Sequence, residues 1–330
     1  MQKWGNKSLK KTILVSGASG IVGYGCLKSL RRSENYKLIG TSIYNSIVAQ
    51  KFSDIFLVAP HTNSKEYLDW LTNTIRLYHV DVIIPGIEID MYEWNKHRSE
   101  LEQTGAKILL NNKDLIESCK DKWKFFLKLN EKAPELAIPT FLENGYEQII
   151  DLVGTPFIMK PINGYGSKGV VLIHDEIEYR FYNEKSQKVN IIQKFIQGEE
   201  YTVGTIFDNE SKLHSYICMK RKLSSSGYTE EAEVVDIPNM KQCLEKLSLI
   251  FKPIGITNFQ FICDEKKIRL LEINPRISSS NYIRTLFGYN ECEMGVNLLL
   301  NNELPDHISI KRGKAVRYVE EVIQYDRSNI

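Results

Sequence analysis

The first third of the chain alternates short apolar runs with amphipathic stretches. Five runs rich in branched residues stand out, and between them the apolar positions recur with a helical period, as in residues 64–79; the runs are "TILVSG", "YKLIGTS", "DIFLVAP", "VDVIIPG" and "AKILL". Strands that alternate with helices form a parallel sheet that helices cover. The pattern therefore predicts an α/β lobe with five strands within residues 11–110.

The pattern changes after residue 110. Residues 111–133 have a helical period that stops at Pro134, and from residue 139 onward short strands and hairpins dominate. A helix is expected to start at residue 240 and to end at Gly255, and residues 257–275 read as a hairpin. A single helix over residues 281–301 and a strand over 314–322 complete the prediction.

Composition and charge exclude several classes of protein. The 330 residues contain 42% hydrophobic and 25% charged residues, which is ordinary for a globular chain, with room for two or three lobes. The 43 basic and 41 acidic residues give a net charge of +2, so nucleic acid is not an expected partner. No apolar run reaches the roughly 18 residues of a membrane span, so no membrane partner is expected.

The cysteines and the N-terminus indicate the compartment. The six cysteines are scattered without a C-x-x-C pair, and the histidines have no metal-ligand spacing. The apolar stretch after the first lysines is short and interrupted by glycine, unlike the core of a signal peptide. We therefore expect a reduced, cytoplasmic protein whose mature chain starts near Met1.

A glycine-rich turn follows the first apolar run, in "TILVSGASGIVGYGCLKSL". Strand, turn and helix in this order allow a dinucleotide site, but such a site needs an acid near the end of the second strand, and "YKLIGTSIYN" has none. The pair Tyr92 and Lys96 also lacks the spacing expected of a reductase. An NAD(P)-dependent reductase or epimerase is therefore an alternative only, and the glycines are explained by close packing of helix on strand.

Three further segments contain candidate chemistry. In "FIMKPINGYGSKGV", Lys160 precedes a loop with Gly164, Gly166 and Gly169, whose backbone N–H groups could bind phosphate oxygens beside the lysine, although a plain turn also fits. In "NIIQKFIQGEEYTV", a buried strand leads to a linker that could bind an adenine edge, with Glu200 able to accept ribose hydroxyls. The stretch 220–233, rich in Ser and charged residues, is expected to be a mobile lid.

The third segment is the hairpin in "TNFQFICDEKKIRLLEINPR". With a loop at residues 265–267, Gln260 falls opposite Glu272, and Asn274 shares their face. Carboxylate and amide oxygens suit Mg²⁺, although a solvated hairpin face is the simpler alternative. Glu272 interrupts an apolar run, where a lone buried carboxylate would be costly, so we favour a metal face.

Together, "MKP…GYGSKGV", "QKFIQGEEYTV" and "NFQF…LLEINPR" resemble the ATP-grasp enzymes, and most closely their carbamoyl-phosphate-synthase-like branch. The resemblance covers nearly the whole chain. It implies a Rossmann-like lobe over residues 1–110 that precedes a two-lobed ATP-grasp fold. Residues 111–190 would form linker helices and the small lobe with its Gly-rich loop, and residues 191–330 the C-terminal lobe with the metal-binding hairpin.

The resemblance also implies roles for individual residues. Lys122 and Lys160 resemble the two phosphate-contacting lysines, and Arg276 resembles the residue that binds the acyl phosphate or its acceptor. The Gly-rich loop, the linker and the hairpin would supply the remaining ligands of ATP and of Mg²⁺ or Mn²⁺, namely Gly164, Gly166, Ser167 and Gly169; Gln193, Lys194, Ile196 and Glu200; and Gln260, Glu272 and Asn274. Glu88 follows a strand end where the acceptor cleft of such enzymes opens.

The activity implied by the resemblance is that of a carboxylate–amine ligase. A substrate carboxylate would be activated by ATP as an acyl phosphate and attacked by an amine, with a homodimer as the implied assembly. Ser278 to Ser280 stand where carbamoyl phosphate synthases have another arginine, so bicarbonate is not implied as the substrate. The alternative within the resemblance is a nucleotide-binding subunit without ligase chemistry.

Overall fold

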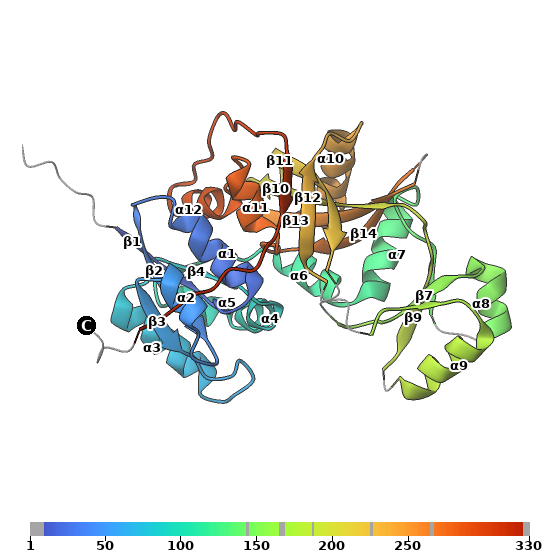
Figure 1. Cartoon of the computed structure of the whole chain (residues 1–330), viewed down its shortest axis with the longest axis horizontal. Coiled ribbons are helices and arrows are strands. Elements are labelled where there is room, and N and C mark those ends of the chain that lie inside the picture. The colour runs from blue at the N-terminus through green and yellow to red at the C-terminus, as the bar shows by residue number, and fades with distance from the viewer. Residues whose placement is uncertain are drawn as a thin grey trace, which may run out of the picture. The chain divides into compact units, whose positions relative to one another are not determined.

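The computed structural model describes residues 10–142, 145–164, 169–186, 188–224, 227–264 and 267–325 (Figure 1). The chain divides into two compact units. Unit 1 consists of Met1–Leu110, Arg276–Ser309 and Tyr318–Ile330, and unit 2 consists of Asn111–Pro275 and Ile310–Arg317. Each unit is therefore built from segments that are far apart in the sequence.

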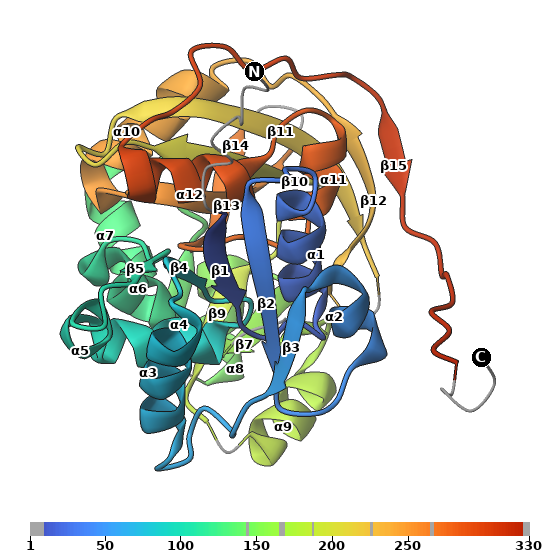
Figure 2. The same cartoon turned by 90° about the vertical axis from the view of Figure 1, so that its left-hand side faces the viewer.

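Unit 1 contains a five-stranded parallel sheet with strand order β3-β2-β1-β4-β5 (Figure 2). The strands are β1 (Lys11–Val15), β2 (Tyr36–Ser42), β3 (Ile55–Val58), β4 (Val82–Ile84) and β5 (Lys107–Ile108). The helices between them are α1 (Ile21–Leu30), α2 (Ile47–Phe52), α3 (Tyr67–Tyr78), α4 (Glu88–Lys96) and α5 (Arg98–Glu102). The predicted parallel sheet is confirmed.

The glycine-rich turn of unit 1 allows a helix to approach a strand closely. Gly17 has φ of +56°, and a Cβ on Gly23 would lie 2.3 Å from the Gly17 carbonyl oxygen. A side chain at Gly23 would therefore force α1 away from the turn that follows β1. This confirms that close packing of helix on strand accounts for the glycines. β2 ends at Ser42, so it does not supply the acid that a dinucleotide site would need there.

Two helices from the C-terminal third complete unit 1. Residues 281–301 were expected to form one helix, but they form α11 (Asn281–Leu286) and α12 (Glu291–Asn301). The chain turns between them at Gly288, which has φ of +96° and ends the first helix. α1 packs against both α11 and α12.

Unit 2 contains a six-stranded antiparallel sheet with strand order β14-β13-β10-β11-β12-β15. Its strands are β10 (Glu199–Phe207), β11 (Leu213–Leu223), β12 (Thr229–Val234), β13 (Gly255–Cys263), β14 (Ile268–Asn274) and β15 (Lys314–Val316). One apolar core joins it to α6 (Lys113–Lys120), α7 (Lys122–Lys132) and α10 (Met240–Phe251).

Three expectations about unit 2 were wrong in detail. The helix that starts at Met240 ends at Phe251, because Lys252 adopts a left-handed conformation, and Gly255 begins β13. The last strand stops at Val316. The expected lid 220–233 is instead mostly part of the paired strands β11 and β12.

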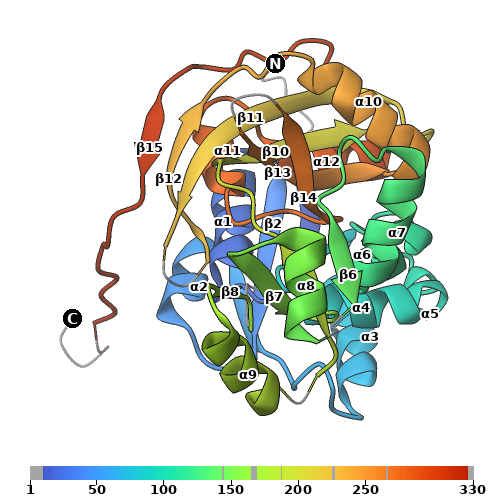
Figure 3. The same cartoon turned by 90° about the vertical axis from the view of Figure 1, so that its right-hand side faces the viewer.

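A second, four-stranded sheet of unit 2 has the order β6-β9-β7-β8. It comprises β6 (Thr140–Leu142), β7 (Phe157–Pro161), β8 (Val171–Ile173) and β9 (Asn190–Lys194), with α8 (Tyr146–Val153) and α9 (Glu176–Lys185). Phe157, Ile173, Ile192 and Tyr179 form its core with α8 and α9. Figure 3 labels β6, β7 and β8 of this sheet together with α8 and α9. Across the described ranges, no helix has both the length and the apolar character that a bilayer span requires.

Candidate nucleotide-binding site

The hairpin β13–β14 brings the predicted metal residues onto one face of the six-stranded sheet. Gln260 pairs with Glu272, and Asn258 pairs with Asn274, so the predicted register is confirmed. Residues between these positions, such as Phe259, are directed into the apolar core under α7 and α10. Because side chains alternate along a strand, the polar residues lie on the sheet face opposite that core.

The oxygen-bearing side chains on this face fit a hard divalent cation. Asn274 Nδ2 donates a hydrogen bond of 3.0 Å to Glu272 Oε1, which holds the carboxylate beside the amide. Glu272 is exposed, so the expectation that it is a costly buried carboxylate was wrong. No group of three His, Cys, Asp or Glu side chains within the described ranges could hold a metal ion, so a site here needs amide oxygens as well.

Arg221, on β11, belongs to the same face, and the sequence did not single it out. Its Nη2 donates hydrogen bonds to Glu200 Oε2, at 3.0 Å, and to Gln260 Oε1. The Arg221 side chain is only 8% exposed. Strand alternation could have identified it, because Met219 is buried and Arg221 follows it at the period of a strand.

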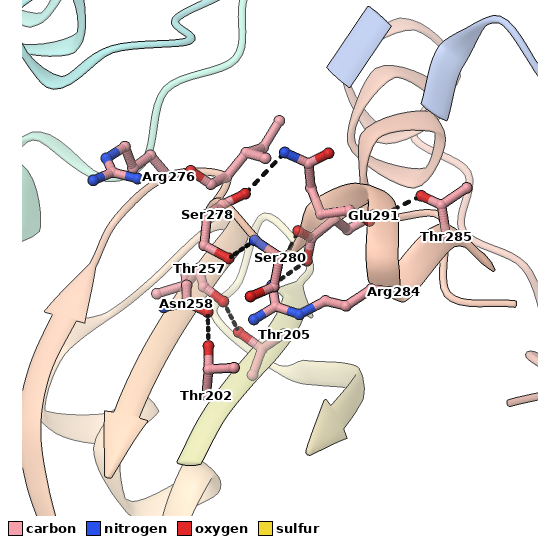
Figure 4. A network of polar contacts seen from close by, with 12 residues as sticks. Thr202, Thr205, Thr257, Asn258, Arg276, Ser278, Ser280, Arg284, Thr285 and Glu291 are labelled. Carbon is pink, nitrogen blue, oxygen red and sulfur yellow. Dashed lines mark hydrogen bonds and ion pairs between the residues drawn. The ribbon is translucent and has the colours of Figure 1, made fainter. Parts of the chain in front are cut away.

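The floor of this face is held by hydrogen bonds between β10 and β13 (Figure 4). Thr202 Oγ1 donates to Asn258 Oδ1 at 2.7 Å, and Thr205 Oγ1 donates to the Thr257 carbonyl oxygen at 2.8 Å. All four residues are buried. These buried hydrogen bonds tie β10 to β13, the strand that contains Gln260.

Lys160 lies on β7, in the four-stranded sheet. Its Nζ donates a hydrogen bond of 2.8 Å to Gln193 Oε1, and Gln193 Nε2 in turn donates to Thr140 Oγ1 at 3.0 Å. Burial lowers the pKa of Lys160 to about 8; the Lys122 ammonium also lowers it, while the Glu272 carboxylate opposes the shift. The two predicted lysines and the predicted metal carboxylate of unit 2 therefore interact electrostatically.

Lys122 is the first residue of α7, and this position follows from the local sequence. The Asp121 side chain caps the helix by accepting hydrogen bonds from the backbone N–H groups of Trp123 and Lys124, both at 3.0 Å. Lys122 Nζ donates a hydrogen bond of 2.9 Å to the carbonyl oxygen of Gly164, at the start of the Gly-rich loop. Helix and loop thus meet at this lysine.

The rest of the Gly-rich loop is described only in part. Gly169 has φ of +78°, a conformation that glycine adopts without a steric penalty. Gly166 and Ser167, which the resemblance assigns to phosphate binding, lie outside the described residues.

The predicted adenine and ribose residues follow one another between β9 and β10. Lys194 ends β9 with its side chain exposed, and its backbone N–H donates to the Pro139 carbonyl oxygen at 2.9 Å. Ile196 is half-buried, and Glu200 is on β10 with Arg221 as its partner. Glu199, the neighbouring acid, pairs instead with Lys220.

Arg276 is part of unit 1, where it meets Glu88. Arg276 Nη2 and Glu88 Oε1 are 3.1 Å apart, and their side chains are 17% and 15% exposed. Arg276 Nη1 also donates to the Ile277 carbonyl oxygen at 2.9 Å. The sequence had indicated both residues separately, whereas their pairing is a result of the tertiary structure.

The chain thus combines a parallel α/β unit with an antiparallel unit in which Lys160 interacts electrostatically with Glu272 and Lys122. Residues 119–280 match the family model described as the ATP-grasp domain, so this part of the chain belongs to the ATP-grasp superfamily.

Curated relatives point to one branch of that superfamily. The carbamoyl phosphate synthase large chain of Archaeoglobus fulgidus is 25% identical over 245 residues, which cover 67% of this chain and 22% of that protein. The large chain of Clostridium acetobutylicum is 26% identical over 230 residues, covering 63% and 21%. The matched region is thus about a fifth of the length of these relatives.

Solved structures confirm the fold. The N5-carboxyaminoimidazole synthetase of Staphylococcus aureus in complex with ADP superposes with a TM-score of 0.74 at 18% identity, over 92% of this chain and 80% of that one. A biotin carboxylase from Campylobacter jejuni gives a TM-score of 0.72 at 17% identity, over 92% and 74%. At these identities the likeness establishes the architecture only.

Proposed function

We propose that this chain is an ATP-dependent ligase that activates a substrate carboxylate as an acyl phosphate, which an amine then attacks. The observation that carries the proposal is the cluster of charges in unit 2, where the Lys160 ammonium interacts electrostatically with the Glu272 carboxylate and with the Lys122 ammonium. Phosphoryl transfer from ATP needs cations that bind the phosphate oxygens, and it needs side-chain oxygens that hold a metal ion.

In this proposal, Lys122, Lys160 and the Gly-rich loop hold the nucleotide phosphates. Lys160 is oriented by Gln193, and Lys122 is fixed at the capped start of α7, so both cations are in place before the substrate binds. Preorganised cations in a site of low dielectric stabilise the charge that develops on the transferring phosphoryl group.

Glu272 and the amide oxygens of Asn274 and Gln260 would hold Mg²⁺ or Mn²⁺. A divalent ion at this place would neutralise phosphate charge and orient the transferring group. Glu272 and Asn274 present oxygens on the polar face of the hairpin, which suits such an ion, whereas Gln260 Oε1 on the same face accepts a hydrogen bond from Arg221.

The nucleoside would lie against the segment between β9 and β10. Lys194 and Ile196 would border the adenine, and Glu200 would accept a ribose hydroxyl with the carboxylate oxygen that Arg221 leaves available. Arg276 would bind the acyl phosphate or the acceptor, with Glu88 restraining its guanidinium.

The test is ADP release from MgATP by the purified chain, with a panel of amino acids paired with small carboxylates. Activity that depends on one pair of substrates identifies the acceptor. Lys160→Ala and Glu272→Ala should each lower turnover by ~10²- to 10³-fold, because each removes a preorganised contact to the transferring group. Full activity in either variant would contradict the assignment of these residues.

A second candidate function is a nucleotide-binding subunit of a larger assembly. The 245 residues that match the Archaeoglobus fulgidus protein cover 22% of its length. ATP binding without ADP release across the whole panel would support this alternative, and substrate-dependent release would reject it.

A further inference from the structure

On the polar face of the six-stranded sheet, a positively charged side chain, Arg221, contacts Gln260, which the sequence had predicted to be a metal ligand. The guanidinium of Arg221 donates from Nη2 both to Gln260 Oε1 and to Glu200 Oε2. Its side chain is 8% exposed, and its Nε is buried without a hydrogen-bond partner among the described residues. Four other arginines of the described residues also have a buried Nε without a hydrogen-bond partner, so the position of Arg221 beside Gln260 and Glu200, rather than its Nε, distinguishes it.

The contact with Arg221 changes what Gln260 can do. Its amide oxygen is directed at a fixed positive charge, and a divalent cation that coordinated the same oxygen would be repelled by that charge at short range. Glu272, by contrast, accepts a hydrogen bond from neutral Asn274, and its electrostatic interaction with the Lys160 ammonium involves no direct ion pair among the described residues. The two halves of the predicted metal face therefore differ in electrostatics.

Glu200 explains why Arg221 stays at this position. Its carboxylate lies 3.0 Å from Arg221 Nη2 and compensates part of the buried charge, while the Glu200 side chain itself is 36% exposed. Arg221 is thus held from two strands, by Glu200 on β10 and by Gln260 on β13. A planar guanidinium held in this way suits the recognition of phosphate oxygens.

We propose that Arg221 binds the nucleotide phosphates in place of a second divalent ion, so that the chain binds ATP with one divalent ion at Glu272 and Asn274. Gln260 then positions Arg221 and is not a principal metal ligand. This inference rests on the proposed nucleotide site and specifies its composition. The competing explanation is structural, namely that Arg221 only ties β11 to β10 and β13.

The experiment counts bound Mn²⁺ by electron paramagnetic resonance in the full chain, titrated with Mn²⁺ in the presence of adenylyl imidodiphosphate. Nucleotide affinity is measured in parallel by calorimetry. The variants are Arg221→Met and Arg221→Lys, with Lys220→Met as the matched control, because Lys220 is the adjacent residue of β11 and pairs with Glu199 instead. Two further variants, Gln260→Ala and Glu272→Gln, compare how much each of these residues contributes to Mn²⁺ binding.

The wild-type chain should bind one Mn²⁺ per bound nucleotide. Arg221→Met should bind the nucleotide at least tenfold more weakly at low Mn²⁺ concentration, and should recover affinity with a second Mn²⁺ as that concentration rises. Arg221→Lys should keep one Mn²⁺ but bind the nucleotide more weakly than the wild type, because an ammonium lacks the planar set of donors, and Lys220→Met should match the wild type. Gln260→Ala should change Mn²⁺ affinity less than threefold, whereas Glu272→Gln should lose Mn²⁺ binding.

Several outcomes would overturn the inference. One is the binding of two Mn²⁺ ions by the wild type, and another is an Arg221→Met variant that behaves like Lys220→Met. A third is a Gln260→Ala variant that loses Mn²⁺ as completely as Glu272→Gln. Each of these results would leave nucleotide binding established. If the wild type binds no nucleotide, the proposed function fails first, and the inference fails with it.

Discussion

At the scale of single residues, Lys160 shows how burial adjusts a side chain for anion binding. Its ammonium is partly buried beside Gln193, and its pKa is lowered to about 8, first by burial and then by Lys122. Below about pH 8 the lysine is charged in the folded chain. Bound phosphates would favour the charged form, so that nucleotide binding and protonation of Lys160 are linked.

This linkage predicts proton uptake when MgADP binds. At pH 8.5, we expect well over half a proton to be taken up per nucleotide, because a group with a pKa of about 8 is mostly deprotonated there. Calorimetry in buffers with different protonation enthalpies measures the uptake. Lys160→Arg should abolish it, and unchanged uptake in that variant would show that another group titrates.

The same shift affects stability with a defined sign. Between about pH 8 and the ordinary value of 10.5, the unfolded chain keeps a proton on Lys160 that the folded chain has lost. The contribution of Lys160 to the free energy of unfolding therefore rises with pH across this window. Below about pH 8, where Lys160 is charged in both states, its burial destabilises the folded chain by the full amount.

At the scale of elements, the start of α7 connects stability to the site. Asp121 divides the predicted helical stretch 111–133 into α6 and α7, because its side chain caps the second helix while its backbone is extended. Lys122 consequently occupies the first helical position and reaches Gly164. A single capping residue thus positions a predicted phosphate-binding lysine.

Asp121→Ala should destabilise the chain by about 1 kcal/mol, since two N–H groups lose their acceptor. It should also weaken nucleotide binding, because the first turn of α7 frays. The midpoint of urea denaturation and nucleotide calorimetry measure the two effects. Asp121→Asn retains the cap and should retain both properties; equal loss in the Asn variant would mean that the charge, rather than the cap, is responsible.

At the scale of the whole molecule, unit 1 depends on a segment that is remote in sequence. Residues 276–309 return to the unit that begins the chain, and α11 and α12 pack against α1. Arg284 Nη1 donates to both carboxylate oxygens of Glu291, at 3.0 and 2.9 Å, and both side chains are fully buried (Figure 4). This ion pair joins α11 to α12.

Glu291→Gln should lower the free energy of unfolding by about 3–5 kcal/mol, because it leaves a buried guanidinium without its counter-charge. Chemical denaturation monitors the loss. The double variant Arg284→Met with Glu291→Leu removes both charges and should recover most of the stability. A double variant as unstable as Glu291→Gln would indicate that packing, rather than an uncompensated charge, determines the effect.

The sequence by itself determined those features that depend on local pattern. Alternation of apolar runs and helices predicted the parallel sheet, and the period of two along β13 and β14 predicted that Gln260 lies opposite Glu272. Both follow from neighbours along the chain or across one hairpin. The joint motif also identified the ATP-grasp superfamily, which the match over residues 119–280 supports.

Only the tertiary structure decided the contacts between distant strands and helices. Arg221 lies between Glu200 and Gln260 because β10 pairs with both β11 and β13, an order that no local pattern specifies. Glu88 and Arg276, far apart in the sequence, pair because the chain returns to unit 1 at residue 276. Periodicity determines which face a side chain occupies, whereas the order of strands determines which charges meet there.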